Sequence, residues 1–117
     1  MKEKFFLVHD GADPKPEIIE LDTAQLLDGM YQAIGCDCID IVHVQTGLLL
    51  PQGVVMVADE SGWFRGAPRV NKFASVWYHD VIVGKVILAA EGYRNGEPDL
   101  VGLNDAQLKF LCAAFGI

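Results

Sequence analysis

Apolar residues recur along this chain with two different spacings. Alternating or β-branched runs predict strands, because successive side chains of a strand point to opposite faces. Such runs occur at residues 4–9, 17–21, 38–45, 54–57, 63–65, 86–94 and 97–101. The spacing i, i+3, i+4 predicts helices instead, and it occurs at residues 26–34 and 105–115. The pattern therefore indicates several short strands and two main helices.

Turn and cap residues mark the ends of these elements. Gly35 follows the first helix at the position of a left-handed C-terminal cap. Asn104 and Gln107 have the three-residue spacing of a capping box at the start of the second helix. Asn95-Gly96 is typical of a two-residue hairpin, so residues 86–94 are expected to pair with residues 97–101.

The order of these elements favours the α+β class, because strands and helices do not alternate regularly. We predict a mostly antiparallel or mixed sheet of five to seven short strands, with the two main helices packed on one face. The chain has 117 residues, of which 51% are hydrophobic. That length and composition suffice for one core, so residues 1–117 are expected to form a single domain.

The charge balance limits the partners that this chain can have. Nine basic residues stand against sixteen acidic residues, which gives a net charge of −7. Such a charge repels nucleic-acid phosphates, so general DNA or RNA binding is disfavoured. A local basic patch, or a partner that is itself basic, remains compatible with it.

Cysteine usage and hydropathy indicate a compartment. The three cysteines, Cys36, Cys38 and Cys112, are odd in number and lack a disulfide framework, which predicts buried thiols in a reducing environment. The apolar run at residues 5–8 is too short for a signal peptide, and no later stretch reaches the length of a membrane span. We expect a cytoplasmic protein that does not bind membranes.

The segment 63–78 concentrates cationic and aromatic side chains in an otherwise acidic chain. Planar guanidinium groups suit phosphates or carboxylates, and aromatic faces can stack on a base. Asn71 is also placed to cap a short helix that runs to Tyr78. The alternative is that the aromatic residues fill the core while the cations face solvent. The candidate ligand-binding residues are Trp63, Arg65, Arg69, Asn71 and Lys72.

Metal and catalytic chemistry are the weaker hypotheses. Cys36 and Cys38 are one residue apart, so on a strand they would point to opposite faces, and zinc sites need a second pair of ligands. We expect no metal and no cofactor. A hydrolase or transferase could be assembled only if the fold brings His43, His79 and nearby acids together. No catalytic residue is assigned, and an enzyme is the less favoured class.

Several short features follow one another in a particular order. They are Leu26 to Gly35 before Ile39 to Val44, Val54 to Gly62, Pro68 with Asn71, Asp80 to Gly84, and Leu103-Asn104-Asp105. This order resembles a family from bacteriophages and mobile elements, catalogued as domain of unknown function 3846. The resemblance covers about residues 17–111 and leaves the first strand outside. It implies a phage or mobile-element setting and brings no established activity.

The leading hypothesis is therefore a non-enzymatic binding module, which captures a small anionic, nucleotide-like ligand or a host protein. An acidic decoy that covers a basic host surface is the second hypothesis, and a small hydrolase or transferase is the third. Exposed strand edges also favour a homodimer.

Overall fold

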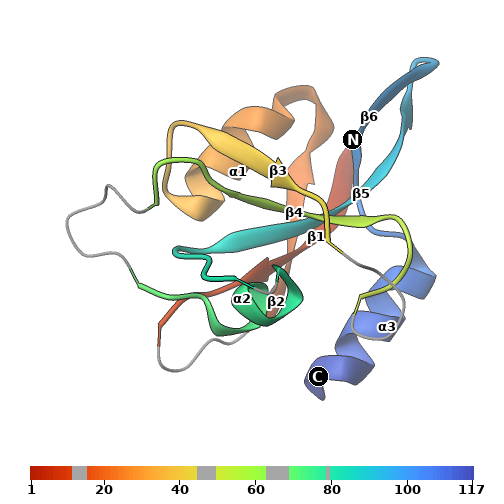
Figure 1. Cartoon of the computed structure of the whole chain (residues 1–117). Helices are drawn as coiled ribbons and strands as arrows, with labels where there is room; N and C mark the ends of the chain where they lie inside the picture. Colours follow the sequence, from red (N-terminus) through yellow and green to blue (C-terminus); the bar gives the residue numbers. More distant parts are fainter. Residues whose placement is uncertain (12–15, 45–49, 63–68, 79) are drawn as a thin grey trace.

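The structure, a computed structural model, describes residues 1–11, 16–44, 50–62, 69–78 and 80–117. Within these residues the chain forms six strands, three α-helices and a short 3₁₀ helix, η1 (Figure 1). In chain order they are β1 (Lys2–Val8), β2 (Pro16–Asp22), η1 (Thr23–Gln25), α1 (Leu26–Ile34), β3 (Ile39–Val42), β4 (Val54–Asp59), α2 (Lys72–Tyr78), β5 (Val86–Arg94), β6 (Glu97–Val101) and α3 (Asp105–Phe115).

All six strands belong to one sheet with the order β2-β1-β5-β4-β3, and β6 pairs with the far end of β5. Every pair of neighbouring strands is antiparallel. Leu88 lies in the middle of the sheet, where Phe6 is its neighbour on β1 and Met56 its neighbour on β4. The predicted α+β class and antiparallel sheet are confirmed.

Side chains of β1, β4 and β5 alternate between two hydrophobic layers, because both faces of the sheet are covered. Phe6, Met56 and Leu88 point to the face covered by α2 and α3. Phe5, Val57 and Ile87 point to the opposite face, which α1 covers through Met30 and Ile34. The prediction that the two main helices share one face is therefore wrong. The central strands read as continuous apolar runs because they are buried on both sides.

Local signals in the sequence set the ends of the helices. Gly35 caps α1 in the left-handed conformation, with φ of +82°. Asn104 and Gln107 form both hydrogen bonds of the capping box at the start of α3. The hairpin between β5 and β6 turns at Asn95 and Gly96, which both have positive φ. These three predictions are confirmed.

Two aromatic residues of α2, Phe73 and Trp77, belong to the core. Phe73 meets the ring of Phe115 edge-on at 4.8 Å between ring centres, and Trp77 does the same at 5.9 Å. Phe115 also stacks on Phe6 of β1 at 5.7 Å. These contacts join α2, α3 and the sheet, so Phe73 and Trp77 have the packing role that was the alternative to ligand binding.

Candidate functional site

The residues predicted to bind a ligand are not all in the described part of the chain. Trp63 and Arg65 lie outside it. Arg69 and Lys72 are both exposed, whereas Asn71 between them is completely buried. The structure thus places two of the predicted cations at the surface, on either side of a buried amide.

The amide of Asn71 holds three segments of backbone together. Its Nδ2 donates to the carbonyls of Val8 and Gly84, both at 3.0 Å, and its Oδ1 accepts from the N–H of Ala74 at 3.1 Å. The last bond caps α2, as the sequence predicts. Each of these bonds is to the protein's own backbone, so Asn71 positions the cations and the end of β1.

The side chain of Arg69 lies next to Gly11. A Cβ atom added to Gly11 would stand 2.6 Å from Cζ of Arg69, so the exposed arginine side chain would have to shift. Gly11 also has φ of +91° and donates its N–H to the carbonyl of Val70. The backbone around Arg69 is therefore tied to the end of β1, while its guanidinium group lies at the surface.

A hollow lies elsewhere on the molecule, on the face of the sheet that α1 covers. Its volume is about 550 Å³. It is lined by one side chain of α1, by β3 and the residue that follows it, and by both strands of the β5–β6 hairpin. The lining residues are Leu27, Ile39, Ile41, His43, Glu91, Gly92, Tyr93, Pro98, Asp99 and Leu100.

The hollow exists because β5 is longer than its neighbour β4. The pairing between them ends where Val54 meets Ala90, with one further bond from the N–H of Glu91 to the carbonyl of Gly53. Beyond that point β5 continues to Arg94, paired only with β6, and the hairpin projects past the rest of the sheet (Figure 1). The lining of the hollow comes from this projecting hairpin, α1 and β3.

Apolar side chains at the hollow are unusually accessible. The exposed fraction is 42% for Ile41, 51% for Leu27 and 75% for Tyr93. His43 and Glu91 add polar groups, with 3.5 Å between Nε2 and Oε2, and both side chains are more than half exposed. The hollow thus combines an apolar surface with an ion-pairing group that remains in contact with water.

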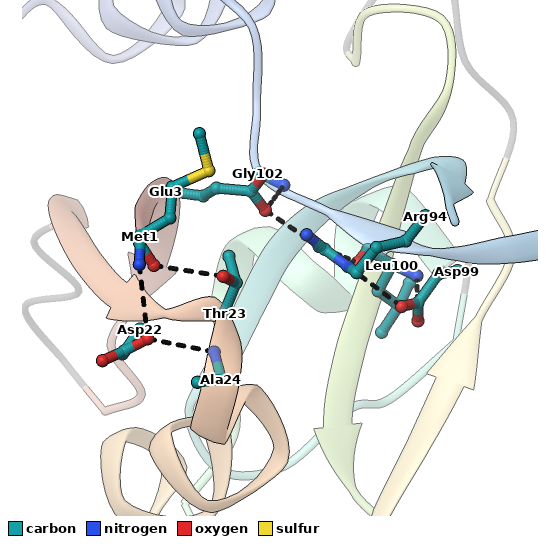
Figure 2. Close-up of polar contacts among 9 residues, drawn as sticks. All are labelled: Met1, Glu3, Asp22, Thr23, Ala24, Arg94, Asp99, Leu100 and Gly102. Carbon is teal, nitrogen blue, oxygen red and sulfur yellow. Dashed lines mark hydrogen bonds and ion pairs between the residues drawn. The ribbon is translucent and has the colours of Figure 1, made fainter. Parts of the chain in front are cut away.

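A smaller hollow of about 280 Å³ adjoins the first and shares four of its lining residues, Leu27, Ile39, Asp99 and Leu100. Arg94 lines it and is fixed by a set of hydrogen bonds (Figure 2). Its Nη2 donates to Oε1 of Glu3 and to the carbonyl of Leu100, both at 2.9 Å, and its Nε donates to Asp99 at 3.1 Å.

Glu3 joins this network to the end of β6. Its Oε1 also accepts from the N–H of Gly102 at 3.0 Å. The hydrogen bond from Arg94 lowers the pKa of Glu3, and the bond from Gly102 adds to that effect. The hydrogen bond to Glu3, and with it the bond to Asp99, raises the pKa of Arg94. The network ties β1 to the β5–β6 hairpin and thereby supports one wall of the hollows.

Other polar groups provide weaker candidates. His9 pairs with Glu17 at 3.5 Å near the edge of the sheet, and His79 lies outside the described residues. Cys38 is exposed, while Cys36 and Cys112 are half-buried. The prediction that the three thiols are buried is therefore wrong for Cys38 and only partly right for the other two. Cys38 differs because it precedes β3 and contacts neither hydrophobic layer. In the described ranges, no three His, Cys, Asp or Glu side chains converge as a metal site.

Among the residues that the structure describes, no helix combines the length and the apolar character that a membrane crossing requires.

The hollow could not be read from the sequence, because its lining comes from segments far apart along the chain. Two weak signals did exist. Ile39 and Ile41 flank the polar Asp40 on β3, and Tyr93 follows the apolar run at the start of β5. Neither signal reveals that β4 stops short of the end of β5.

Comparison with known proteins bears on the fold and on the family. No curated protein matches the chain. A crystal structure of the small RNA methyltransferase HEN1 superposes with a TM-score of 0.66 at 14% sequence identity; the match covers 96% of this chain and 16% of that one. At this identity the likeness concerns the fold alone, and this chain corresponds to a small part of that protein.

A family model matches residues 1–116, so it extends beyond the resemblance expected at residues 17–111 and includes β1. The structure supports this wider extent, because β1 is paired on both sides within the sheet. The chain belongs to the family described as Domain of unknown function (DUF3846).

Proposed function

We propose that this protein is a non-enzymatic binding module that holds an extended segment of a partner protein in the hollow between α1, β3 and the β5–β6 hairpin. The segment would present an apolar side chain to the hollow and a lysine or arginine to its rim. The observation that carries the proposal is an apolar hollow of about 550 Å³ whose lining includes two carboxylates, that of Glu91 next to His43 and that of Asp99 next to Arg94.

The apolar lining supplies the driving force for such binding. Ile41, Leu27 and Tyr93 keep a large part of their surface in water. Removing apolar surface from water yields roughly 25 cal/mol per Å², so one seated leucine side chain contributes about 2 kcal/mol. That gain is modest, and further contacts must supply the rest of the affinity.

Charge supports a basic partner. Glu91 and Asp99 are exposed, and the whole chain has a net charge of −7. A field of this sign attracts a cationic segment and accelerates its encounter with the protein. A basic host protein, in the phage or mobile-element setting that the family resemblance implies, is the partner that we propose.

The composition of the hollow favours binding over catalysis. His43 and Glu91 could serve as an acid–base pair, but the nucleophiles that neighbouring groups most often activate are the side chains of serine, cysteine, threonine and lysine. The described residues that line the 550 Å³ hollow include none of these four types. Both members of the pair are also open to water, whereas catalytic groups are typically held in a desolvated site.

The test uses two capped pentapeptides, Lys-Val-Leu-Val-Lys and Glu-Val-Leu-Val-Glu, titrated into ¹⁵N-labelled protein. We expect saturable shifts of the amide signals from β3 and from the β5–β6 hairpin with the basic peptide. The acidic peptide should bind at least about tenfold more weakly, because Glu91 and Asp99 repel it.

Ile41→Asp should remove the binding, since it puts a carboxylate on the apolar surface. Ile18→Asp is the matched control: Ile18 is 43% exposed on the other edge strand, against 42% for Ile41, and does not line the hollow. Absence of saturable binding to the wild type, or equal binding by the Ile41→Asp variant, would refute the proposal.

A second candidate function is the capture of a small anionic ligand by Arg69 and Lys72. One observation supports it, namely that both cationic side chains are exposed in a chain of net charge −7. Asn71 would act there only as a support, because its amide is fully used by the backbone.

A further inference from the structure

Strand β5 has one side that no described residue pairs with beyond Glu91. We propose that the partner segment is added to the sheet at this open edge, hydrogen-bonded to the backbone of Tyr93. The inference rests on the proposed function and specifies how the segment is recognised. Binding by strand addition obtains affinity from main-chain hydrogen bonds and specificity from alternate side chains.

The direction of the backbone groups follows from the pairing on either side of β5. The N–H of Glu91 donates to Gly53, so at this residue the backbone points away from β6. Backbone groups along a strand repeat their direction every second residue. Tyr93 therefore directs its N–H and its carbonyl to the same side as Glu91.

Of the segment before β4, the described residues 50–53 do not pair with that side of Tyr93. An antiparallel continuation of β4 would place Pro51 opposite Tyr93, and proline has no N–H to donate. The segment instead turns away at Gly53, which has φ of +81°, and the carbonyl of Gln52 accepts from Gln107 of α3. Leu50 is buried in the layer on the α3 side of the sheet.

An added strand would place its side chains in register with the hollow. Directly opposite residues of neighbouring strands point to the same face of a sheet, so the residue opposite Tyr93 points, like the Tyr93 side chain, to the face that α1 covers. There it would meet the apolar surface formed by Ile41 and Leu100. The carboxylate of Glu91 lines the same hollow and would attract a cationic side chain of the segment.

Charge distinguishes this occupant from a second copy of the chain. Two copies joined at the same edge would combine two net charges of −7. Like net charges repel each other and oppose the association of two copies. A basic segment removes that repulsion, so the partner is a basic, extended polypeptide.

The decisive comparison is Tyr93→Ala against Tyr93→Pro, titrated with the Lys-Val-Leu-Val-Lys peptide. Both variants lose the phenol ring, but only proline also loses the N–H. Proline is tolerated on an edge strand when its nitrogen faces away from the pairing strand. We expect Tyr93→Ala to weaken binding by less than about threefold, and Tyr93→Pro by at least about tenfold.

Equal affinities of the two variants would overturn strand addition while leaving the hollow as a binding site. Absence of binding to the wild-type protein would refute the proposed function as well. If Tyr93→Pro does not fold, strand addition can be tested on the wild-type protein instead, by measuring its affinity for peptides methylated at one backbone nitrogen at a time. A loss of at least about tenfold at alternate positions supports the inference, and uniform affinity along the peptide contradicts it.

Discussion

Glu3 shows how one side chain supports the geometry of a distant segment. Its carboxylate joins Arg94 of the hairpin and the N–H of Gly102 to β1, across about the whole length of the chain. Gly102 approaches so closely that an added Cβ would stand 2.6 Å from Cβ of Glu3. The hairpin that bounds the hollow is thus anchored at a residue that no motif in the sequence marks.

We predict that Glu3→Gln lowers the free energy of unfolding by about 1 kcal/mol at neutral pH, because it removes the charge from a partly buried pair. The pKa of Glu3 is lower in the folded protein than in the unfolded chain. Its contribution is therefore fully present above the ordinary pKa of a glutamate and is lost as the pH falls through the lowered value.

Urea unfolding of wild type and Glu3→Gln between neutral pH and about pH 3 measures this effect. The two curves should converge at the acidic end. A difference in stability that is constant over the whole range would show that charge at Glu3 contributes nothing.

At Arg69 and Lys72 the expectation concerns a ligand. If these cations capture a small anion, calorimetry with a panel of nucleotides should detect binding that Arg69→Ala combined with Lys72→Ala weakens at least about tenfold, since charge-assisted hydrogen bonds are lost. Lys109→Ala on α3, where Lys109 is also exposed, is the control. If no nucleotide binds, or if the double variant binds as tightly as the wild type, the hypothesis that Arg69 and Lys72 capture an anion is refuted.

At the scale of elements, α2 and α3 are both capped at their N-terminal ends by an asparagine, but the two asparagines have different surroundings. Asn104 caps α3 at the surface, whereas Asn71 caps α2 from the interior and also donates to two carbonyls. When an exposed capping side chain is removed, water can replace its hydrogen bonds. When a buried one is removed, its partners remain without a hydrogen bond. The same amino acid therefore has a larger effect in α2.

We predict that Asn71→Ala lowers the free energy of unfolding by about 3 kcal/mol, because the carbonyls of Val8 and Gly84 lose a buried donor. Asn104→Ala should lower it by about 1 kcal/mol, the usual effect of losing an exposed cap. Chemical denaturation of both variants provides the comparison. Equal losses of unfolding free energy would show that the buried hydrogen bonds of Asn71 stabilise the protein no more than an exposed cap does.

At the scale of the molecule, the sheet separates two hydrophobic layers that fold as parts of one structure. Met30 of α1 is 1% exposed in one layer, and Leu111 of α3 is completely buried in the other. Truncating either side chain removes apolar contacts and leaves a cavity. Each layer should therefore matter about equally for stability.

Met30→Ala and Leu111→Ala are each expected to lower the free energy of unfolding by about 3 kcal/mol. Val76→Ala is the control, because Val76 is 53% exposed on α2, and it should change stability by less than about 0.5 kcal/mol. Thermal or urea unfolding of the three variants and the wild type measures these differences in stability. A variant of Met30 that is as stable as the control would contradict the burial of the α1 face.

The sequence by itself determined the elements whose signals are local. A cap needs only the side chain and the backbone three residues on, as at Asn104, and a tight turn needs only residues that accept positive φ, as at Asn95 and Gly96. The class of fold followed from the order of such elements.

Only the tertiary structure decided which helix covers which face and where the hollow lies. The apolar runs of β4 and β5 bury both faces, so they carry no alternation from which the side of a helix could be inferred. The hollow depends on β5 extending past β4, a relation between segments more than thirty residues apart along the chain. Local pattern cannot encode such a relation, because it arises when the strands pair.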